Sequence, residues 1–151
     1  MNQTPEAAKR TLSIERSFDA PLKLVWEAWT QPEHIAKWWG PPGVEVKIIE
    51  HDFRVGGKWA YQMPMPNGAV FETDGEYQEI EEQKSIVTTA NFRPMTEGVV
   101  MHIHFSANGA KTDLAFHVVH ESEAYAKQQD EMGFQKGWGA TLDRLANHLA
   151  G

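Results

Sequence analysis

Residues 99–120 read VVMHIHFSANGAKTDLAFHVVH, two runs of alternating apolar and polar residues on either side of Asn108-Gly109. A two-residue turn of this type between alternating runs is a strong signal of a β-hairpin. A tight turn at that point predicts that Met101 faces Phe116, so that apolar side chains lie opposite one another. We therefore expect two antiparallel strands that share one apolar face.

The same alternation recurs towards the N-terminus and indicates further strands. The expected strands cover residues 10–18, 44–51, 56–63, 70–80, 85–93, 99–107 and 110–120. Asn67-Gly68 is a less regular turn signal, because a strict two-residue turn would place Met63 opposite Glu72. A shift of one residue brings Phe71 to the apolar face instead. The sequence thus predicts a longer, irregular loop at this point.

Two short helices are expected after the first strand. Pro21 suits the first helical position, and Leu22, Val25, Trp26 and Trp29 follow at helical spacing. Pro32 breaks this helix and starts a second one, whose apolar residues are Ile35, Trp38 and Trp39; the run Gly40–Gly43 (GPPG) ends it.

A single long helix is expected over residues 123–149, where Phe134, Trp138, Leu142, Leu145 and Leu149 recur at helical spacing. Three glycines, Gly133, Gly137 and Gly139, lie in its middle, each costing about 1 kcal/mol relative to alanine. They indicate either a kink or close packing against the sheet, or else room for a cavity between helix and sheet. The order of elements predicts an α+β layer arrangement, in which the helix covers the apolar face of a sheet of about seven strands.

Composition narrows the class of protein. The chain has 151 residues, a length typical of one domain, with no cysteine and a net charge of −7. The missing cysteines exclude disulfide and thiolate-metal sites, and the acidic balance argues against nucleic-acid binding. Residues 1–9 are polar and predict a flexible tail before a domain spanning 10–151. No secretory signal and no membrane-spanning run occur, which predicts a cytoplasmic protein.

Several stretches together resemble a known family. They are Phe18–Pro21 (FDAP), Val25–Thr30 (VWEAWT) with Pro32, Trp38–Pro41 (WWGP), Phe53–Trp59 (FRVGGKW), and Gly137-Trp138 with Leu142 and Leu145. In this order they resemble the START-like, helix-grip (SRPBCC) superfamily. Within it, the chain is similar to stand-alone members of the family of the C-terminal domain of the activator of heat-shock protein 90 ATPase.

The resemblance implies a curved seven-stranded antiparallel sheet that grips the C-terminal helix, often with an apolar pocket between them. It does not imply a reaction, since the superfamily includes lipid and hormone carriers as well as polyketide cyclases. The chain lacks the N-terminal domain of the eukaryotic co-chaperones, which argues against a direct role in activating the chaperone.

Aromatic and methionine side chains are the candidates for lining such a pocket. The expected ligand-binding residues are Trp38, Trp39, Trp59, Tyr61, Met63, Phe71, Tyr77, Met101, Phe116, Met132 and Trp138. The simpler alternative is that these residues form an ordinary packed core. The pocket hypothesis predicts binding of a small apolar or amphipathic molecule, with the segment 38–43 and the loop at Asn67 flanking the mouth.

Two other functions remain open. The same pocket could serve an enzyme of cyclase, dehydratase or hydrolase type, which a buried carboxylate or tyrosine beside the cavity would favour. The chain could instead be a protein-interaction module, and its edge strands and aromatics allow a homodimer. No nucleophile elbow, phosphate loop or dinucleotide fingerprint is present, so we assign no catalytic residue and expect no cofactor.

The charged and histidine candidates give weaker signals. His102 and His104 share a strand face with Asp113 expected opposite, a pattern that could hold a metal. Their parity is opposite to that of Met101, however, so we expect them to face solvent and expect no metal site. Arg16 falls on the apolar face of its strand, either as a structural residue or as an anchor for an acidic ligand group.

Overall fold

The structure, a computed structural model, describes residues 11–39, 46–65, 67–93, 96–120, 122–131 and 133–150. The expected flexible tail, the helix stop at 40–43 and the candidate Met132 lie outside the described residues. The strands are β1 (Thr11–Phe18), β2 (Lys47–His51), β3 (Lys58–Pro64), β4 (Val70–Glu81), β5 (Ser85–Arg93), β6 (Thr96–Asn108) and β7 (Lys111–Val119). The helices are α2 (Leu22–Thr30), α3 (Pro32–Trp38), α4 (Glu123–Glu131) and α5 (Phe134–Ala150).

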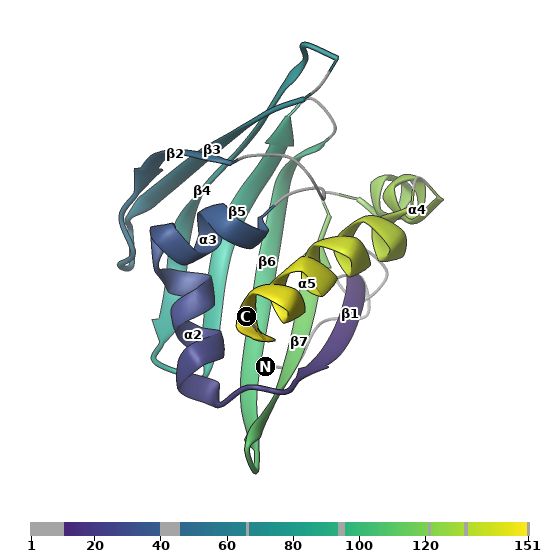
Figure 1. Ribbon diagram of the computed structural model, residues 1–151. Helices are drawn as coiled ribbons and strands as arrows, with labels where there is room; N and C mark the ends of the chain where they lie inside the picture. Colours follow the sequence, from purple (N-terminus) through teal and green to yellow (C-terminus); the bar gives the residue numbers. More distant parts are fainter. Residues whose placement is uncertain are drawn as a thin grey trace.

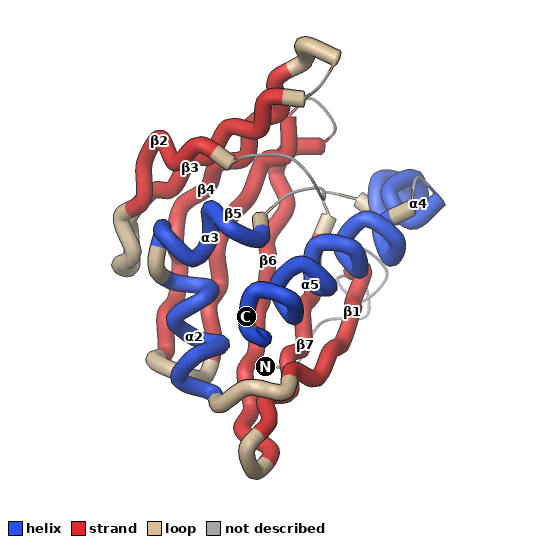
Figure 2. Tube along the Cα trace, in the orientation of Figure 1, coloured by secondary structure: helices blue, strands red, loops and turns tan. Residues whose placement is uncertain are grey.

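The strands form one antiparallel sheet in the order β1-β7-β6-β5-β4-β3-β2. Strands β2 to β7 are neighbours in sequence order, and β1 completes the sheet beside β7 (Figure 1). Helix α5 crosses in front of β6 and β7, while α2 and α3 lie over the other half of the same face (Figure 2). This is the expected α+β helix-grip fold.

The β6–β7 hairpin confirms the apolar face but not the expected register. Met101 pairs with Val118 rather than with Phe116, because the two loop residues are Gly109 and Ala110. Gly109 has φ +62°, the conformation of the first loop residue in a type II′ turn, a position that favours glycine. The residue opposite each position of β6 therefore lies two positions further along β7 than expected. Because side chains alternate between the two faces of a strand, every side chain stays on its expected face.

The loop between β3 and β4 follows the expectation from the sequence. Met63 pairs with Phe71 and Tyr61 with Thr73, so the shifted register is correct. The strands are joined by a longer loop, in which the amide of Met65 donates to the carbonyl of Ala69 over 2.7 Å.

The expected single C-terminal helix is wrong, since two helices replace it. Helix α4 ends at Glu131 and α5 begins at Phe134, with Gly133 at φ +103° between them. Gly139 has a different role: a Cβ atom there would lie 3.0 Å from Nη2 of Arg16. The structure therefore supports the first explanation for these glycines. Gly133 breaks the helix, and Gly139 allows close packing. None of the helices in the described ranges has the length and apolar character needed to cross a membrane.

Candidate functional site

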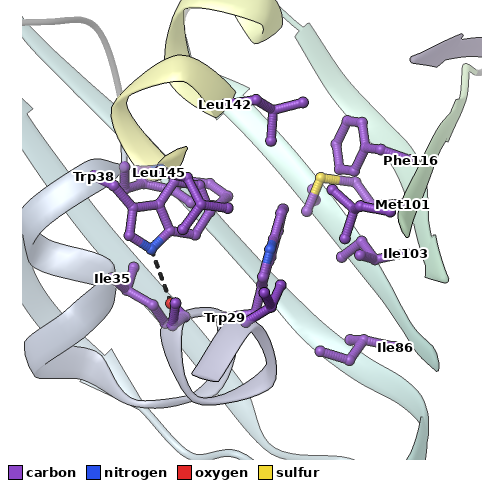
Figure 3. Close-up of a cluster of buried hydrophobic side chains, with 14 of the residues drawn as sticks. Trp29, Ile35, Trp38, Ile86, Met101, Ile103, Phe116, Leu142 and Leu145 are labelled. Carbon is purple, nitrogen blue, oxygen red and sulfur yellow. Dashed lines mark hydrogen bonds between the residues drawn. The ribbon is translucent and has the colours of Figure 1, made fainter. Parts of the chain in front are cut away.

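The end of α2 and the whole of α3 bring an aromatic cluster onto the sheet. Trp29 and Trp38 are buried and meet edge to face, with ring centroids 4.7 Å apart. The Nε1–H of Trp38 donates to the carbonyl of Ala28 over 2.8 Å, which ties α3 to α2 (Figure 3). Figure 3 shows Trp29 between Trp38 and the sheet residue Met101, with Leu142 of α5 above them and Leu145 beside Trp38.

A small cavity lies inside this cluster, between α2, α3 and strands β3 to β6. Its volume is about 20 Å³. One water molecule needs roughly 10–15 Å³ of such space, so the cavity holds a group the size of a single water. Six of the expected residues line it, namely Trp38, Trp39, Trp59, Tyr61, Tyr77 and Met101.

The other expected residues lie elsewhere. Met63 and Phe71 pair with each other near the β3–β4 loop. Phe116 and Trp138 pack against each other, with ring centroids 4.5 Å apart. No described residue of α5 lines the cavity, so it differs in position from the expected pocket between the C-terminal helix and the sheet. The bulky side chains of α5 occupy that space.

Five lining residues were not among the candidates: Trp29, Ile35, Ile86, Thr88 and Ile103. Trp29 and Ile35 belong to the apolar stripes already visible on the two short helices. Ile86 and Thr88 alternate along β5, and Ile103 shares the core face of β6 with Met101. Strand parity and helix periodicity could have identified all five.

A row of hydrogen bonds leads from the cavity to the end of α2. Nε2 of His51 lies 2.7 Å from the carbonyl oxygen of Thr30, and Nδ1 lies 2.9 Å from the hydroxyl of Tyr61. A carbonyl only accepts, so Nε2 carries the hydrogen, and in the neutral imidazole Nδ1 accepts from Tyr61. Tyr77 also lines the cavity, and its presence raises the pKa of Tyr61. We call Tyr61, His51 and the Thr30 carbonyl the relay.

The two phenols at the cavity, Tyr61 and Tyr77, stay neutral. Burial raises the pKa of Tyr61, and the neighbouring Tyr77 raises it further. Burial also raises the pKa of Tyr77, against a smaller opposing effect of Tyr61. Desolvation disfavours the phenolate. These hydroxyls can therefore orient a bound group through hydrogen bonds, but they do not supply a phenolate near neutral pH.

The indoles around the cavity differ in how their N–H groups are satisfied. Nε1–H of Trp59 donates to Oγ1 of Thr88 over 2.8 Å, and that hydroxyl has two carbonyl acceptors, Thr89 at 2.8 Å and Glu76 at 3.1 Å. By contrast, Nε1 of Trp29 is buried and has no hydrogen-bond partner within the part of the chain that the structure describes. Buried donors are nearly always paired, so this one is an exception that calls for a reason.

The outer-face histidines do not form the expected arrangement with a carboxylate. His102 pairs with His117, while Asp113 lies opposite Ser106 and accepts from Ser17. Burial, followed by the charges of its histidine neighbours, lowers the pKa of His102. Over the described ranges, no group of three or more histidine or carboxylate side chains could hold a metal ion.

The contacts of Arg16 are with the backbone of its own strand and of α5. Its Nη1 donates to the carbonyl of Glu15 over 3.3 Å, and its guanidinium reaches the backbone of α5 at Gly139. This position favours the structural role over an anchor for an acidic ligand.

Comparisons with known proteins identify relatives of the whole domain. A family model described as Activator of Hsp90 ATPase homolog 1-like protein matches residues 19–150. A crystal structure of a protein from Nitrosomonas europaea is 28% identical, with a TM-score of 0.82 and coverage of 95% of this chain and 96% of that one. No match was found among curated proteins.

Two more distant structures show the fold alone. A crystal structure of a protein from Mycobacterium smegmatis is 22% identical, has a TM-score of 0.84, and covers 99% of this chain and 97% of its own. A solution structure titled as an AHSA1-like protein, from Aeromonas hydrophila, is 21% identical with a TM-score of 0.74, and the coverage is 93% and 92%.

Proposed function

Because the chain belongs to the Activator of Hsp90 ATPase homolog 1-like family, whose fold commonly binds hydrophobic ligands, we propose that it binds a small apolar or amphipathic molecule. The binding place is the cavity between α2, α3 and strands β3 to β6. The single observation that carries this proposal is the combination of aromatic walls with hydrogen-bonding groups, Tyr61, Tyr77 and the unpaired Trp29, at one small cavity. Ligand sites typically combine such walls with a few polar groups that fix orientation.

The size of the cavity sets a condition on binding. A volume of about 20 Å³ admits one water-sized group, so the apolar part of any ligand must displace a side chain. Trp39 is the side chain that we propose to move. It follows the last residue of α3 and meets Trp59, Tyr61 and Trp138 only through edge contacts, with ring centroids 5.5–5.8 Å apart. Binding then exchanges one aromatic contact for another, which limits its cost.

Native mass spectrometry of the freshly purified protein tests for a resident ligand. We expect a discrete adduct that disappears on denaturation. Ile86→Phe places a larger side chain at the cavity and should abolish the adduct. Ile80→Phe, the same exchange at the partner position in β4 outside the cavity, should retain it.

Toluene provides a second test that needs no resident ligand. Four of the six tryptophans line the cavity, and Trp26 does not. In a two-dimensional NMR spectrum, saturable binding should shift the indole signals of the lining tryptophans and leave that of Trp26 largely unchanged. If no adduct is found, and neither toluene nor its hydroxyl analogue phenol binds saturably, the proposed function is wrong.

An enzyme acting in the same cavity is the second candidate, and the relay is the observation that favours it. Neutral Tyr61 could pass a proton between the cavity and His51. If the adduct changes mass on incubation, and Tyr61→Phe retains the adduct but stops the change, the protein is an enzyme. An adduct of constant mass favours binding alone.

A chaperone-linked interaction module is less well supported. Among the described residues the exposed large apolar side chains are Leu24, Ile49, Val55 and Val70, which lie in different segments of the chain. The homodimer is a separate prediction. A dimer peak in the native mass spectrum would confirm it.

A further inference from the structure

The polar groups at the cavity define what kind of atom it receives. The donor is Nε1–H of Trp29, which is buried, lies on a residue that lines the cavity, and has no partner in the described part of the chain. Leaving a buried donor unpaired costs about 1–3 kcal/mol, so an oxygen placed against it would be stabilised.

The hydroxyl of Tyr61 is engaged with Nδ1 of His51, so Tyr77, which also lines the cavity, supplies the complementary acceptor. The oxygen of a neutral phenol keeps lone pairs that can accept a hydrogen bond. The cavity therefore offers one donor, at Trp29, and one acceptor, at Tyr77.

The composition of the walls also restricts the charge of the group that the cavity can bind. The described walls consist of aromatic, aliphatic, methionine and threonine side chains, with no lysine, arginine or histidine among them. An anionic head group, such as a carboxylate or phosphate, would be desolvated there without a counter-charge. A neutral hydroxyl, in contrast, both accepts and donates one hydrogen bond.

We propose that the cavity is the subsite for the neutral hydroxyl group of a phenol or a cyclic alcohol. Its oxygen accepts from Nε1–H of Trp29 and its hydrogen is donated to the oxygen of Tyr77. The volume of about 20 Å³ matches this single group, and the ring to which it is attached takes the place of Trp39. This inference rests on the proposed function and adds the chemical class of the ligand.

Phenol and toluene are the probes, because they have nearly the same shape and differ in a hydroxyl against a methyl group. We expect phenol to bind about tenfold more tightly than toluene, since two hydrogen bonds are gained in a desolvated site. In the NMR spectrum, phenol should also move the indole proton of Trp29 downfield. That signal is identified by its absence in Trp29→Phe.

Two variants separate the hydrogen bonds from the shape of the site. Trp29→Phe removes the donor and Tyr77→Phe removes the acceptor, and each should reduce the preference for phenol to less than about threefold. Trp26→Phe, the same exchange one turn earlier in α2 and outside the cavity, should keep the full preference.

The outcomes distinguish the two levels of the proposal. If phenol and toluene bind wild-type protein equally, or if the preference survives in Trp29→Phe, the hydroxyl subsite is wrong while ligand binding stands. If neither probe binds saturably, ligand binding at this cavity is wrong, and the hydroxyl subsite is wrong with it.

Discussion

The two halves of the interior are built differently although one sheet supports both. Under α5, Phe116, Trp138, Leu142 and Leu145 fill the space with apolar atoms. Under α2 and α3, the core contains a cavity, two buried tyrosine hydroxyls and an unpaired indole N–H. The α5 half thus has the packing of a stable core. The α2–α3 half loses stability to its cavity and its unpaired donor, and a binding site would explain that loss.

Leu145→Ala should show the largest effect, because it removes packing from the filled half. Leu145 is fully buried in the core. We expect the free energy of unfolding to fall by about 2–5 kcal/mol, the usual cost of such a truncation. Urea denaturation followed by circular dichroism measures it. A loss below about 1 kcal/mol would show that α5 is loosely packed, and the contrast between the halves would fail.

Gly75→Ala tests how tightly the other half is closed around its cavity. A Cβ atom at this position would clash with the carbonyl oxygen of Thr89 and would lie 2.9 Å from Cε2 of Trp59. Because backbone must move, we expect a loss of about 1–3 kcal/mol or more. Gly68→Ala is a control without a steric clash, since open space surrounds Gly68, although its φ of +90° adds strain of its own. A loss below about 1 kcal/mol in Gly75→Ala would contradict close packing at this position.

Tyr61→Phe should have an intermediate effect. It removes the hydrogen bond to Nδ1 of His51, which contributes about 0.5–1.5 kcal/mol. Tyr77→Phe keeps that bond, so it should cost less. Thermal unfolding of both variants checks this order. The reverse order would mean that the bond between Tyr61 and His51 contributes little to stability.

The pH dependence of stability should be the smallest effect, and it concerns the contact between the halves. Nδ1 of His34 in α3 lies 2.9 Å from Nε2 of His148 in α5. Burial, and then the charges of His34 and Lys37, lower the pKa of His148 below its ordinary value. The unfolded chain therefore binds a proton more readily, so stability is complete above about pH 6.5 and falls as the pH drops below it.

The measurement is the urea midpoint between pH 7.5 and pH 5.5. We expect it to decrease on acidification, and to decrease less in His148→Gln. Since burial also lowers the pKa of His102, His104 and His120, part of the slope should persist in this variant. A midpoint that rises towards pH 5.5 would contradict the sign.

The sequence predicted the sheet well because alternation depends on neighbouring residues. The core positions Met101, Ile103 and Phe105 on β6 are buried as expected. The hairpin register was wrong because the backbone conformation of Gly109 selected the turn, which the pair Asn108-Gly109 alone does not determine. The long helix was wrong because apolar spacing continues across the break at Gly133.

The candidate site was predictable only in part. Parity placed Trp59, Tyr61 and Tyr77 on the inner face, and all three line the cavity. The relay was not predictable, since it joins His51 to a backbone carbonyl of a helix 21 positions away in the chain. Nor does any local pattern reveal that one indole among several lacks a partner.

The relay ends on Thr30, and Thr30 is the residue next to Trp29. Tyr61, at the other end of the relay, lines the same cavity as Trp29. A ligand in the proposed subsite would therefore meet α2 directly at Trp29, and indirectly through Tyr61 and His51 at the carbonyl of Thr30. Occupancy of the cavity would then be coupled to the C-terminal end of α2 by two routes.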